Sequence, residues 1–350
     1  MRTFSLFLML TILLSGCTQS LATQPPTQPA PVTQTSLPPT AQPQTSPALH
    51  RGINMGNMLE APNEGEWGLF VQKEYFDAIH NAGFDFVRLP VRWNAHAEES
   101  APYTIQPIFF ARIDEVINWA LTRNLTIIVN IHNYDELMSD PWSNEERFLA
   151  IWKQIAEHYK DYPSNLVFEL MNEPNDKLDA ALWNSLISKA LPIVRESNPT
   201  RDVVIGPVQW NSAEWFSTLD LPEDPHLIAT FHYYSPFEFT HQGAEWIGAD
   251  AQAWLGNTWD ATDAHKADVT QTFDAVQAWG TKHKVRILLG EFGAYSKAPQ
   301  DSRVRWTNFV AREAENHGFA WAYWEFGSGF GAYDPVTNQW REDLLKALIP

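Results

Sequence analysis

Short apolar runs alternate with longer amphipathic runs along most of this chain, and this alternation is the strongest constraint on its fold. A short apolar run is typical of a buried strand, whereas apolar residues spaced about 3.6 apart are typical of a helix packed on a sheet. The run "FFARIDEVINWALTRN" shows the second pattern at Ile113, Val116 and Ile117. The expected strands are 51–57, 85–91, 126–132, 166–173, 203–207, 227–234, 286–292 and 319–326, and the clearest expected helices are 72–82, 108–122, 143–160, 179–196, 264–283 and 302–317.

Eight strand–helix units in about 300 residues predict an α/β fold of the (β/α)8 TIM-barrel type. The alternative is an open, doubly wound sheet. That fold ordinarily carries a Gly-rich phosphate loop after its first strand. The stretch "NMGNMLEAPNEG" that follows the first expected strand lacks the G-x-G-x-x-G pattern. The barrel is therefore favoured.

The N-terminal 49 residues differ from the rest of the chain. "MRTFSLFLMLTILLSGC" has a basic start, an apolar run and small residues before Cys17, which predicts a signal peptide over residues 1–16. "LSGC" resembles the lipobox of bacterial lipoproteins, which implies cleavage before Cys17, lipid attachment to its thiol and a location in the cell envelope, at the outer membrane or cell surface. The alternative is an ordinary signal peptide with a chance cysteine.

Residues 17–49 are expected to form a linker. From residue 18 to residue 49 there is no charged side chain, and Pro, Thr and Gln dominate. Such a segment cannot bury enough apolar surface to offset the entropy of ordering, so we expect an extended, disordered chain. The folded domain is then expected over residues 50–350.

The charge of the chain excludes some classes of partner. Its formal net charge is −18, which argues against nucleic acid and anionic membrane surfaces, because both require clustered Lys and Arg. We therefore expect membrane attachment only through the N-terminal lipid. The single cysteine excludes an intrachain disulfide. We expect a monomer.

Polar and aromatic residues gather at the carboxyl ends of the expected strands, which form the active face of a barrel. A buried Arg or Glu costs several kcal/mol unless it is paired, so each residue alone could be a satisfied structural one. Their gathering at one end indicates a site instead. The residues are Asn57, Glu60, Arg88, His132, Asn133, Asn172, Glu173, His232, Tyr234, Glu291 and Trp324.

Two glutamates in this set suit glycoside hydrolysis: Glu173 in "LVFELMNEPN" and Glu291 in "RILLGEFGAY". In that reaction one carboxylic acid protonates the leaving oxygen, and a second carboxylate attacks the anomeric carbon or activates water. Pro174 is expected to stop the strand and hold Glu173 at the barrel mouth, where partial desolvation raises the pKa of a carboxyl. The chain has no H-E-x-x-H motif, no G-x-S-x-G motif and no cysteine in the expected domain. We expect no metal and no cofactor.

Several motifs in order closely resemble glycoside hydrolase family 5, also called cellulase family A: "VRLPVRW", "NIHNY", "LMNEPN", "FHYYSPF", "LLGEFG" and "AYWEF". "RGINMGNMLEAPNEGEWG" and "FTHQGAEW" resemble the bacterial endoglucanase branch, some of whose members also cleave mannan. The resemblance covers essentially residues 50–350. It implies a retaining double displacement on β-linked polysaccharide or oligosaccharide.

The resemblance also implies residue roles. Glu173 would be the acid/base and Glu291 the nucleophile, with Arg88 and Tyr234 hydrogen-bonding Glu291 and keeping it ionised. Asn172 would hold the sugar hydroxyl next to the scissile bond. His132, His232 and Trp324 would shape the subsite that holds the cleaved sugar, and Asn57, Glu60, His241 and Trp246 match positions that bind sugar or close over it in that branch.

One departure from the family pattern concerns specificity. Many relatives carry a second His where this chain has Asn133, which leaves the glucan–mannan balance open. The expected activity is endo-β-1,4-glucanase. The alternatives are a β-mannanase, an enzyme with both activities, an inverting enzyme, or a non-catalytic glycan-binding lipoprotein. A retaining pair should place its carboxyls about 5–5.5 Å apart and an inverting pair roughly 6.5–9.5 Å apart.

Overall fold

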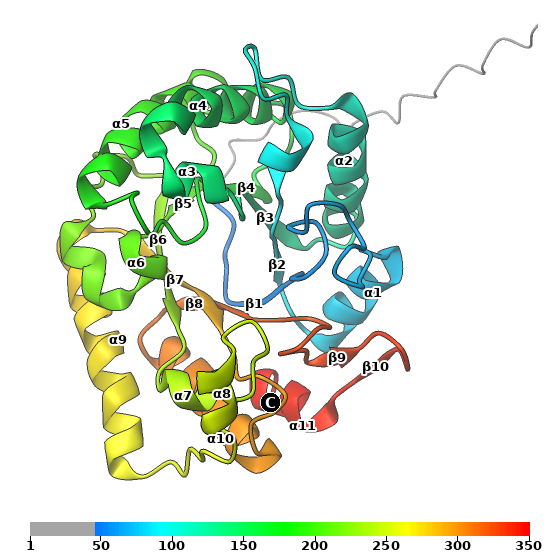
Figure 1. Ribbon diagram of the computed structural model, residues 1–350, viewed down its shortest axis with the longest axis vertical. Coiled ribbons are helices and arrows are strands. Elements are labelled where there is room, and N and C mark those ends of the chain that lie inside the picture. The colour runs from blue at the N-terminus through cyan, green and yellow to red at the C-terminus, as the bar shows by residue number, and fades with distance from the viewer. Residues whose placement is uncertain (1–45) are drawn as a thin grey trace, which may run out of the picture. The chain divides into compact units, whose positions relative to one another are not determined.

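The computed structural model describes residues 46–350, which form the expected closed barrel (Figure 1). Eight parallel strands pair in chain order, and the last pairs back onto the first, so the open-sheet alternative is wrong. Residues 1–45, which include the expected signal peptide, Cys17 and most of the expected linker, lie outside the described part. The strands are β1 (Arg51–Asn54), β2 (Phe86–Leu89), β3 (Thr126–Asn130), β4 (Leu166–Glu169), β5 (Val203–Ile205), β6 (Leu227–Tyr233), β7 (Arg286–Phe292) and β8 (Ala320–Tyr323).

The six clearest expected helices are all present and surround the strands (Figure 1). Local signals set their ends: Asp140 accepts a hydrogen bond from the backbone N–H of Ser143 before a Pro at the first helical position, and Gly83 ends the first helix at φ 97°. The helices are α1 (Lys73–Ala82), α2 (Pro107–Leu121), α4 (Pro141–His158), α5 (Ala180–Ser197), α9 (Asp263–His283) and α10 (Gln300–Asn316).

The fifth strand–helix unit departs from the expected pattern, because no long helix follows β5. The short α6 (Val208–Asn211), in which Gln209 and Trp210 have non-helical backbone angles, and the 3-10 helix η2 (Ala213–Thr218) stand in its place. The sequence pattern missed several other short elements: η1 (Trp93–His96), α3 (Asp135–Ser139), α7 (Phe237–Thr240), α8 (Ala249–Ala253), β9 (Tyr333–Asp334), β10 (Gln339–Trp340) and α11 (Glu342–Leu348). None of the helices between residues 46 and 350 has the length and apolarity that crossing a membrane requires.

The barrel interior has an apolar layer below and a polar layer above. The apolar layer contains Phe86, Ile128, Val167, Val204, Ile228, Leu288, Ala320 and Ala322, and Leu49 packs against it. Because side chains on a strand alternate between two faces, the inward position two residues further along is occupied by Arg88 on β2, Asn130 on β3 and Glu169 on β4. These buried polar residues form the floor of the candidate site at the carboxyl ends of the strands.

Candidate active site

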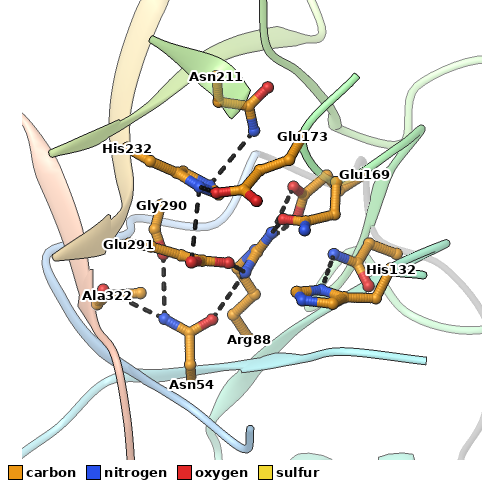
Figure 2. Close-up of polar contacts among 12 residues, drawn as sticks. Asn54, Arg88, His132, Glu169, Glu173, Asn211, His232, Gly290, Glu291 and Ala322 are labelled. Atoms are coloured by element: carbon orange, nitrogen blue, oxygen red, sulfur yellow. Dashed lines mark hydrogen bonds and ion pairs between the residues drawn. The ribbon is translucent and has the colours of Figure 1, made fainter. Parts of the chain in front are cut away.

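Arg88 holds the buried polar layer together (Figure 2). Its side chain has no exposed surface and donates to both carboxyl oxygens of Glu169, at 2.6 and 2.7 Å. It also donates to side-chain oxygens of Asn54 at 2.9 Å, Asn172 at 2.7 Å and Glu291 at 2.7 Å. A buried guanidinium is tolerated only when its charge and its donors are paired. Arg88 therefore fixes side chains of β1, β4, β7 and the loop after β4 relative to one another.

Glu291 points into the site because β7 contains one extra residue. Phe231 of β6 lies opposite Leu289, but the next residue, His232, lies opposite Glu291. Gly290 is skipped, which makes a β-bulge. Leu289 packs in the outer core, so regular alternation would turn Glu291 outward as well. The bulge restores an inward direction for this carboxyl.

Both carboxyl oxygens of Glu291 accept hydrogen bonds. Arg88 donates to Oε1 at 2.7 Å, and the Tyr234 hydroxyl donates to Oε2 at 2.9 Å, the two contacts that the family resemblance implies. Burial raises the pKa of Glu291, while His232 and Arg88 oppose that rise. The direct ion pair with Arg88 favours the ionised form of Glu291 over that of any nearby carboxyl without such a pair.

Glu173 lies in the loop after β4, and its backbone has φ 47°, in the left-handed region. The strand ends at Glu169, four residues before the expected end, so Pro174 does not terminate it; this part of the sequence-based expectation is wrong. A non-glycine residue in this region is strained, and such strain concentrates at functional sites. Burial raises the pKa of Glu173 to about 7, against the opposing charge of Arg88.

His232 lies between the two glutamates (Figure 2). Its Nδ1 is 2.7 Å from Oε1 of Glu173 and 3.5 Å from Oε2 of Glu291. One oxygen of each carboxyl and this nitrogen all lie within 4.8 Å of one another. Burial lowers the pKa of His232 to about 4, so the imidazole is neutral near pH 7. A carboxyl that keeps its proton up to about pH 7, a carboxyl paired with Arg88 and a neutral imidazole therefore share one small space.

The same three residues are the group with metal-ligand spacing in the described part of the chain. Two features of this structure fit a metal poorly. The Arg88 guanidinium already lies 2.7 Å from Glu291, so a cation would be repelled at close range. The raised pKa of Glu173 also favours its neutral form, which is the weaker ligand.

A pocket of about 320 Å³ opens above the two glutamates. In it the rings of His132 and Trp324 stack nearly parallel, with centroids 5.6 Å apart. A flat aromatic face of this kind suits the apolar face of a sugar ring. Ten of the residues expected at the site line the pocket: Asn57, His132, Asn133, Asn172, Glu173, Tyr234, His241, Trp246, Glu291 and Trp324.

Three expected site residues do not line this pocket. Arg88 lies beneath it, and His232 faces the neighbouring hollow. The Glu60 carboxyl accepts hydrogen bonds from the backbone N–H groups of Asn57 and, at 2.9 Å, Met58. Glu60 thus shapes the loop that carries Asn57.

A second hollow of about 680 Å³ lies on the other side of Glu173. Glu173, Tyr234, His241 and Trp246 border both hollows, so the two hollows adjoin at the barrel mouth, and we refer to them together as the groove. The side chains of Trp210 and Phe237 line the second hollow and are about half exposed, at 55% and 46%. Neither residue was identified from the sequence.

Sequence reasoning also missed four polar residues at or beside the site: Asn54, Glu169, Asn211 and Glu325. Signals existed for two of them: Asn54 and Glu169 are polar residues inside otherwise apolar strand runs, and both are completely buried. Glu325 lines the pocket, accepts a hydrogen bond from Asn57 at 2.9 Å, and burial raises its pKa to about 8. Asn211 had no local signal.

A glutamate pair in a groove at the carboxyl ends of a (β/α)8 barrel fits the family resemblance, and comparison with known proteins decides the family. Residues 46–329 match the model of "Cellulase (glycosyl hydrolase family 5)". The chain belongs to glycosyl hydrolase family 5. The expected family is therefore confirmed, and residues 46–49, expected in the linker, fall within the match.

Individual family 5 members support the assignment. The chain is 39% identical to Endoglucanase H of Acetivibrio thermocellus over 327 residues, which covers 90% of this chain and 35% of that protein. The chain thus spans about a third of the length of this curated relative. Thermotoga maritima Cel5A in complex with cellobiose matches with a TM-score of 0.84 and 49% identity over 86% of this chain and 97% of that one. The complex of Cel5A with mannotriose matches with the same TM-score, 48% identity and the same coverage.

Proposed function

We propose that this family 5 protein is an endo-β-1,4-glucanase that hydrolyses β-glucan chains with retention of anomeric configuration. The observation that carries the proposal is the separation of the two carboxyls. One oxygen of Glu173 and one of Glu291 lie within 4.8 Å. An inverting enzyme needs room for a water molecule and separates its carboxyls by roughly 6.5–9.5 Å, whereas direct attack needs about 5–5.5 Å.

In the first step Glu291 attacks the anomeric carbon. A carboxylate oxygen of Glu291 forms the new bond while the glycosidic C–O bond breaks, and Glu173 gives its proton to the leaving oxygen. Arg88 and the Tyr234 hydroxyl, at 2.7 and 2.9 Å from the carboxyl, hold Glu291 ionised and oriented. Because burial raises the pKa of Glu173 to about 7, its carboxyl still carries a proton to donate near neutral pH.

In the second step water replaces Glu291. Glu173, now ionised, takes a proton from water, whose oxygen bonds to the anomeric carbon as the bond to Glu291 breaks. Two inversions give net retention. Both glutamates return to their starting protonation states, so no metal or cofactor is needed to balance the reaction.

The groove suggests how the chain lies. The sugar that becomes attached to Glu291 would occupy the pocket with Trp324 and His132, where the Asn172 side chain is held by Arg88. The leaving part of the chain would occupy the hollow with Trp210 and Phe237. A groove that accommodates sugars on both sides of the scissile bond fits internal cleavage of a long chain.

A second candidate substrate is β-mannan. It is favoured by the mannotriose complex of Thermotoga maritima Cel5A, which is 48% identical to this chain. Asn133 donates to the backbone carbonyl of Glu60 at 3.1 Å and lines the sugar pocket, so its contacts bear on this choice. Differences of this size in one pocket shift substrate preference by only about 1–3 kcal/mol.

The deciding experiment measures both the substrate and the stereochemistry. Release of reducing ends is compared on carboxymethyl cellulose, mixed-linkage glucan, xyloglucan, glucomannan and galactomannan, and the first-formed anomer is followed by proton NMR. We expect the highest rate on a β-1,4-glucan and a β-configured first product. Cleavage of galactomannan alone would favour mannanase, an α-configured first product would show inversion, and no release on any substrate would favour the glycan-binding alternative.

A further inference from the structure

The segment that follows β5 contains three consecutive left-handed residues. Gln209, Trp210 and Asn211 have φ values of 56°, 58° and 56°. For Gln209 and Trp210 this conformation costs roughly 1–2 kcal/mol each, whereas asparagine adopts it more readily. Consecutive residues keep such a conformation only when surrounding contacts determine it. The reason for the turn formed by residues 209–211 therefore lies in what it contacts.

The turn is held by contacts next to Glu173 and at His232, the imidazole that hydrogen-bonds Glu173. The backbone N–H of Trp210 donates to the carbonyl of Pro174, the residue after Glu173, at 3.3 Å. Ser212 pairs with His232 through an isolated parallel bridge. The side chain of Asn211 is completely buried, and its Nδ2 lies 3.3 Å from Nε2 of His232 (Figure 2).

The other ring nitrogen of His232 decides which way this contact runs. Nδ1 faces a carboxyl oxygen of Glu173 at 2.7 Å and one of Glu291 at 3.5 Å. The Glu291 carboxylate would repel a lone pair on Nδ1 but attract an N–H, which can also donate to Glu173. The Nδ2 group of Asn211, which can only donate, faces Nε2, so the proton belongs on Nδ1. Burial lowers the pKa of His232 to about 4, so the ring carries only one proton near neutral pH. Nε2 must then be an acceptor, and it needs a buried donor.

The Asn211 amide is that donor. Its Nδ2 group donates to Nε2, and an aspartate of the same shape could not do so. We propose that Asn211 is a positioning residue that fixes His232 as the Nδ1–H tautomer and thereby directs the acidic proton of Glu173 toward the substrate. This inference rests on the proposed function, because it concerns the acid step of that reaction.

The consequence for Glu173 follows from hydrogen-bond geometry. The His232 N–H occupies Oε1 of Glu173, so Oε1 can act only as an acceptor there. The acidic proton then resides on Oε2. In the opposite tautomer the bare Nδ1 would accept the acidic proton of Glu173 in a hydrogen bond and withhold it from the leaving oxygen.

The turn also accounts for the exposure of its middle residue. Trp210 is 55% exposed and lines the hollow proposed for the leaving part of the chain, while its neighbour Asn211 is wholly buried. The left-handed turn thus sends adjacent side chains to the leaving-group hollow and to the back of His232. This juxtaposition is a reason for the strained backbone to persist.

The first test observes the tautomer directly in the unsubstituted protein. Long-range proton–nitrogen NMR spectra of protein labelled with ¹⁵N-histidine distinguish Nδ1–H from Nε2–H, and the signal of His232 is identified by its loss in His232→Gln. We expect Nδ1–H for His232 at pH 6.5. An Nε2–H imidazole or a charged imidazolium would overturn the inference, whether or not any variant folds.

The second test separates proton delivery from general structural damage. For Asn211→Asp we expect kcat/KM on cellotetraose to fall about 10²-fold, at the lower end of the contribution of a positioned general acid. On 2,4-dinitrophenyl cellobioside, whose leaving group needs no proton, it should fall less than about threefold. Asn211→Ala removes the donor without adding a charge. It should also lower kcat/KM more on cellotetraose than on 2,4-dinitrophenyl cellobioside, but by a smaller factor.

A matched control is available at Asn198, another buried asparagine, which donates to the carbonyl of Ala156 and lies outside both hollows. Asn198→Asp should lower the melting temperature without separating the two substrates. Equal losses on both substrates for the Asn211 variants would reduce Asn211 to a structural residue. Failure of the unsubstituted protein to cleave any glucan would instead count against the proposed function and leave the NMR result to judge the tautomer.

Discussion

His232 on β6 lies directly opposite Glu291 on β7, one residue beyond the register set by Phe231 and Leu289. The skipped residue, Gly290, has no room for a side chain. A Cβ atom there would lie 2.6 Å from Oγ1 of Thr230 and 3.1 Å from Nε2 of His232. The position of the nucleophile proposed here therefore depends on a residue that takes no part in the chemistry.

Gly290→Ala should move His232 or remove the bulge. We expect a loss of about 1–3 kcal/mol in the free energy of unfolding, typical of an overpacked site, and a fall of at least tenfold in kcat/KM. Thr230→Ala removes the closest clashing atom, so the double variant should recover part of the stability in denaturant melts. Wild-type activity in Gly290→Ala would show that the strand pair adapts without cost.

Replacing each proposed catalytic glutamate should give two different phenotypes. Glu291→Ala should lose activity by on the order of 10⁴- to 10⁶-fold, and azide should partly rescue it by occupying the vacated space and forming a glycosyl azide of inverted configuration. Glu173→Ala should retain far more activity on an activated aryl cellobioside than on cellotetraose, because only the latter needs a proton. Azide rescue of Glu173→Ala by an inverted azide, rather than of Glu291→Ala, would exchange the two assignments.

Trp324 should contribute to catalysis rather than to stability, because its ring lines the sugar pocket and stacks on His132. We expect Trp324→Ala to lower kcat/KM at least tenfold, or about 1.4 kcal/mol, with a small change in melting temperature. Trp321→Ala is the matched control. Trp321 is completely buried, so its loss should cost about 3–5 kcal/mol of stability. A comparable melting-temperature loss in both variants would place Trp324 in the core.

The pH dependence of activity should show an alkaline limb set by Glu173. The first step requires its protonated form, and burial raises the pKa of this carboxyl to about 7. As the pH rises through about 7 the protonated fraction falls, so kcat/KM on cellotetraose should fall about tenfold per pH unit above that value. The limb should be absent with 2,4-dinitrophenyl cellobioside. A limb of equal size on both substrates would assign it to another group.

The N-terminal segment supports a separate proposal that the protein is anchored by lipid at Cys17. The motivation is the "LSGC" stretch at the end of an apolar run. After expression in a bacterial host, the protein should fractionate with membranes and incorporate labelled palmitate, whereas Cys17→Ala should do neither. Glucanase activity should be the same in both proteins. Unchanged membrane association of Cys17→Ala would refute the lipobox interpretation.

The sequence by itself determined the barrel and most of the groove. Strand and helix periodicities are local, so all eight strands and the six clearest helices could be placed within a few residues of their true ends. Because parallel strands bring their carboxyl ends to one face, the expected residues at those ends could be assigned to a common site from their positions along the chain. Ten of the thirteen expected residues line the sugar pocket.

Only the tertiary structure decided how those residues are aimed. Alternation along β7 predicts the wrong direction for Glu291, because the bulge at Gly290 exists only through pairing with β6. Asn211 reaches His232 through a left-handed turn that the local preferences of Gln209 and Trp210 disfavour. Both features depend on contacts between segments far apart in the chain. Such contacts stabilise conformations that the local sequence alone disfavours, so the periodicity of the sequence cannot predict these conformations.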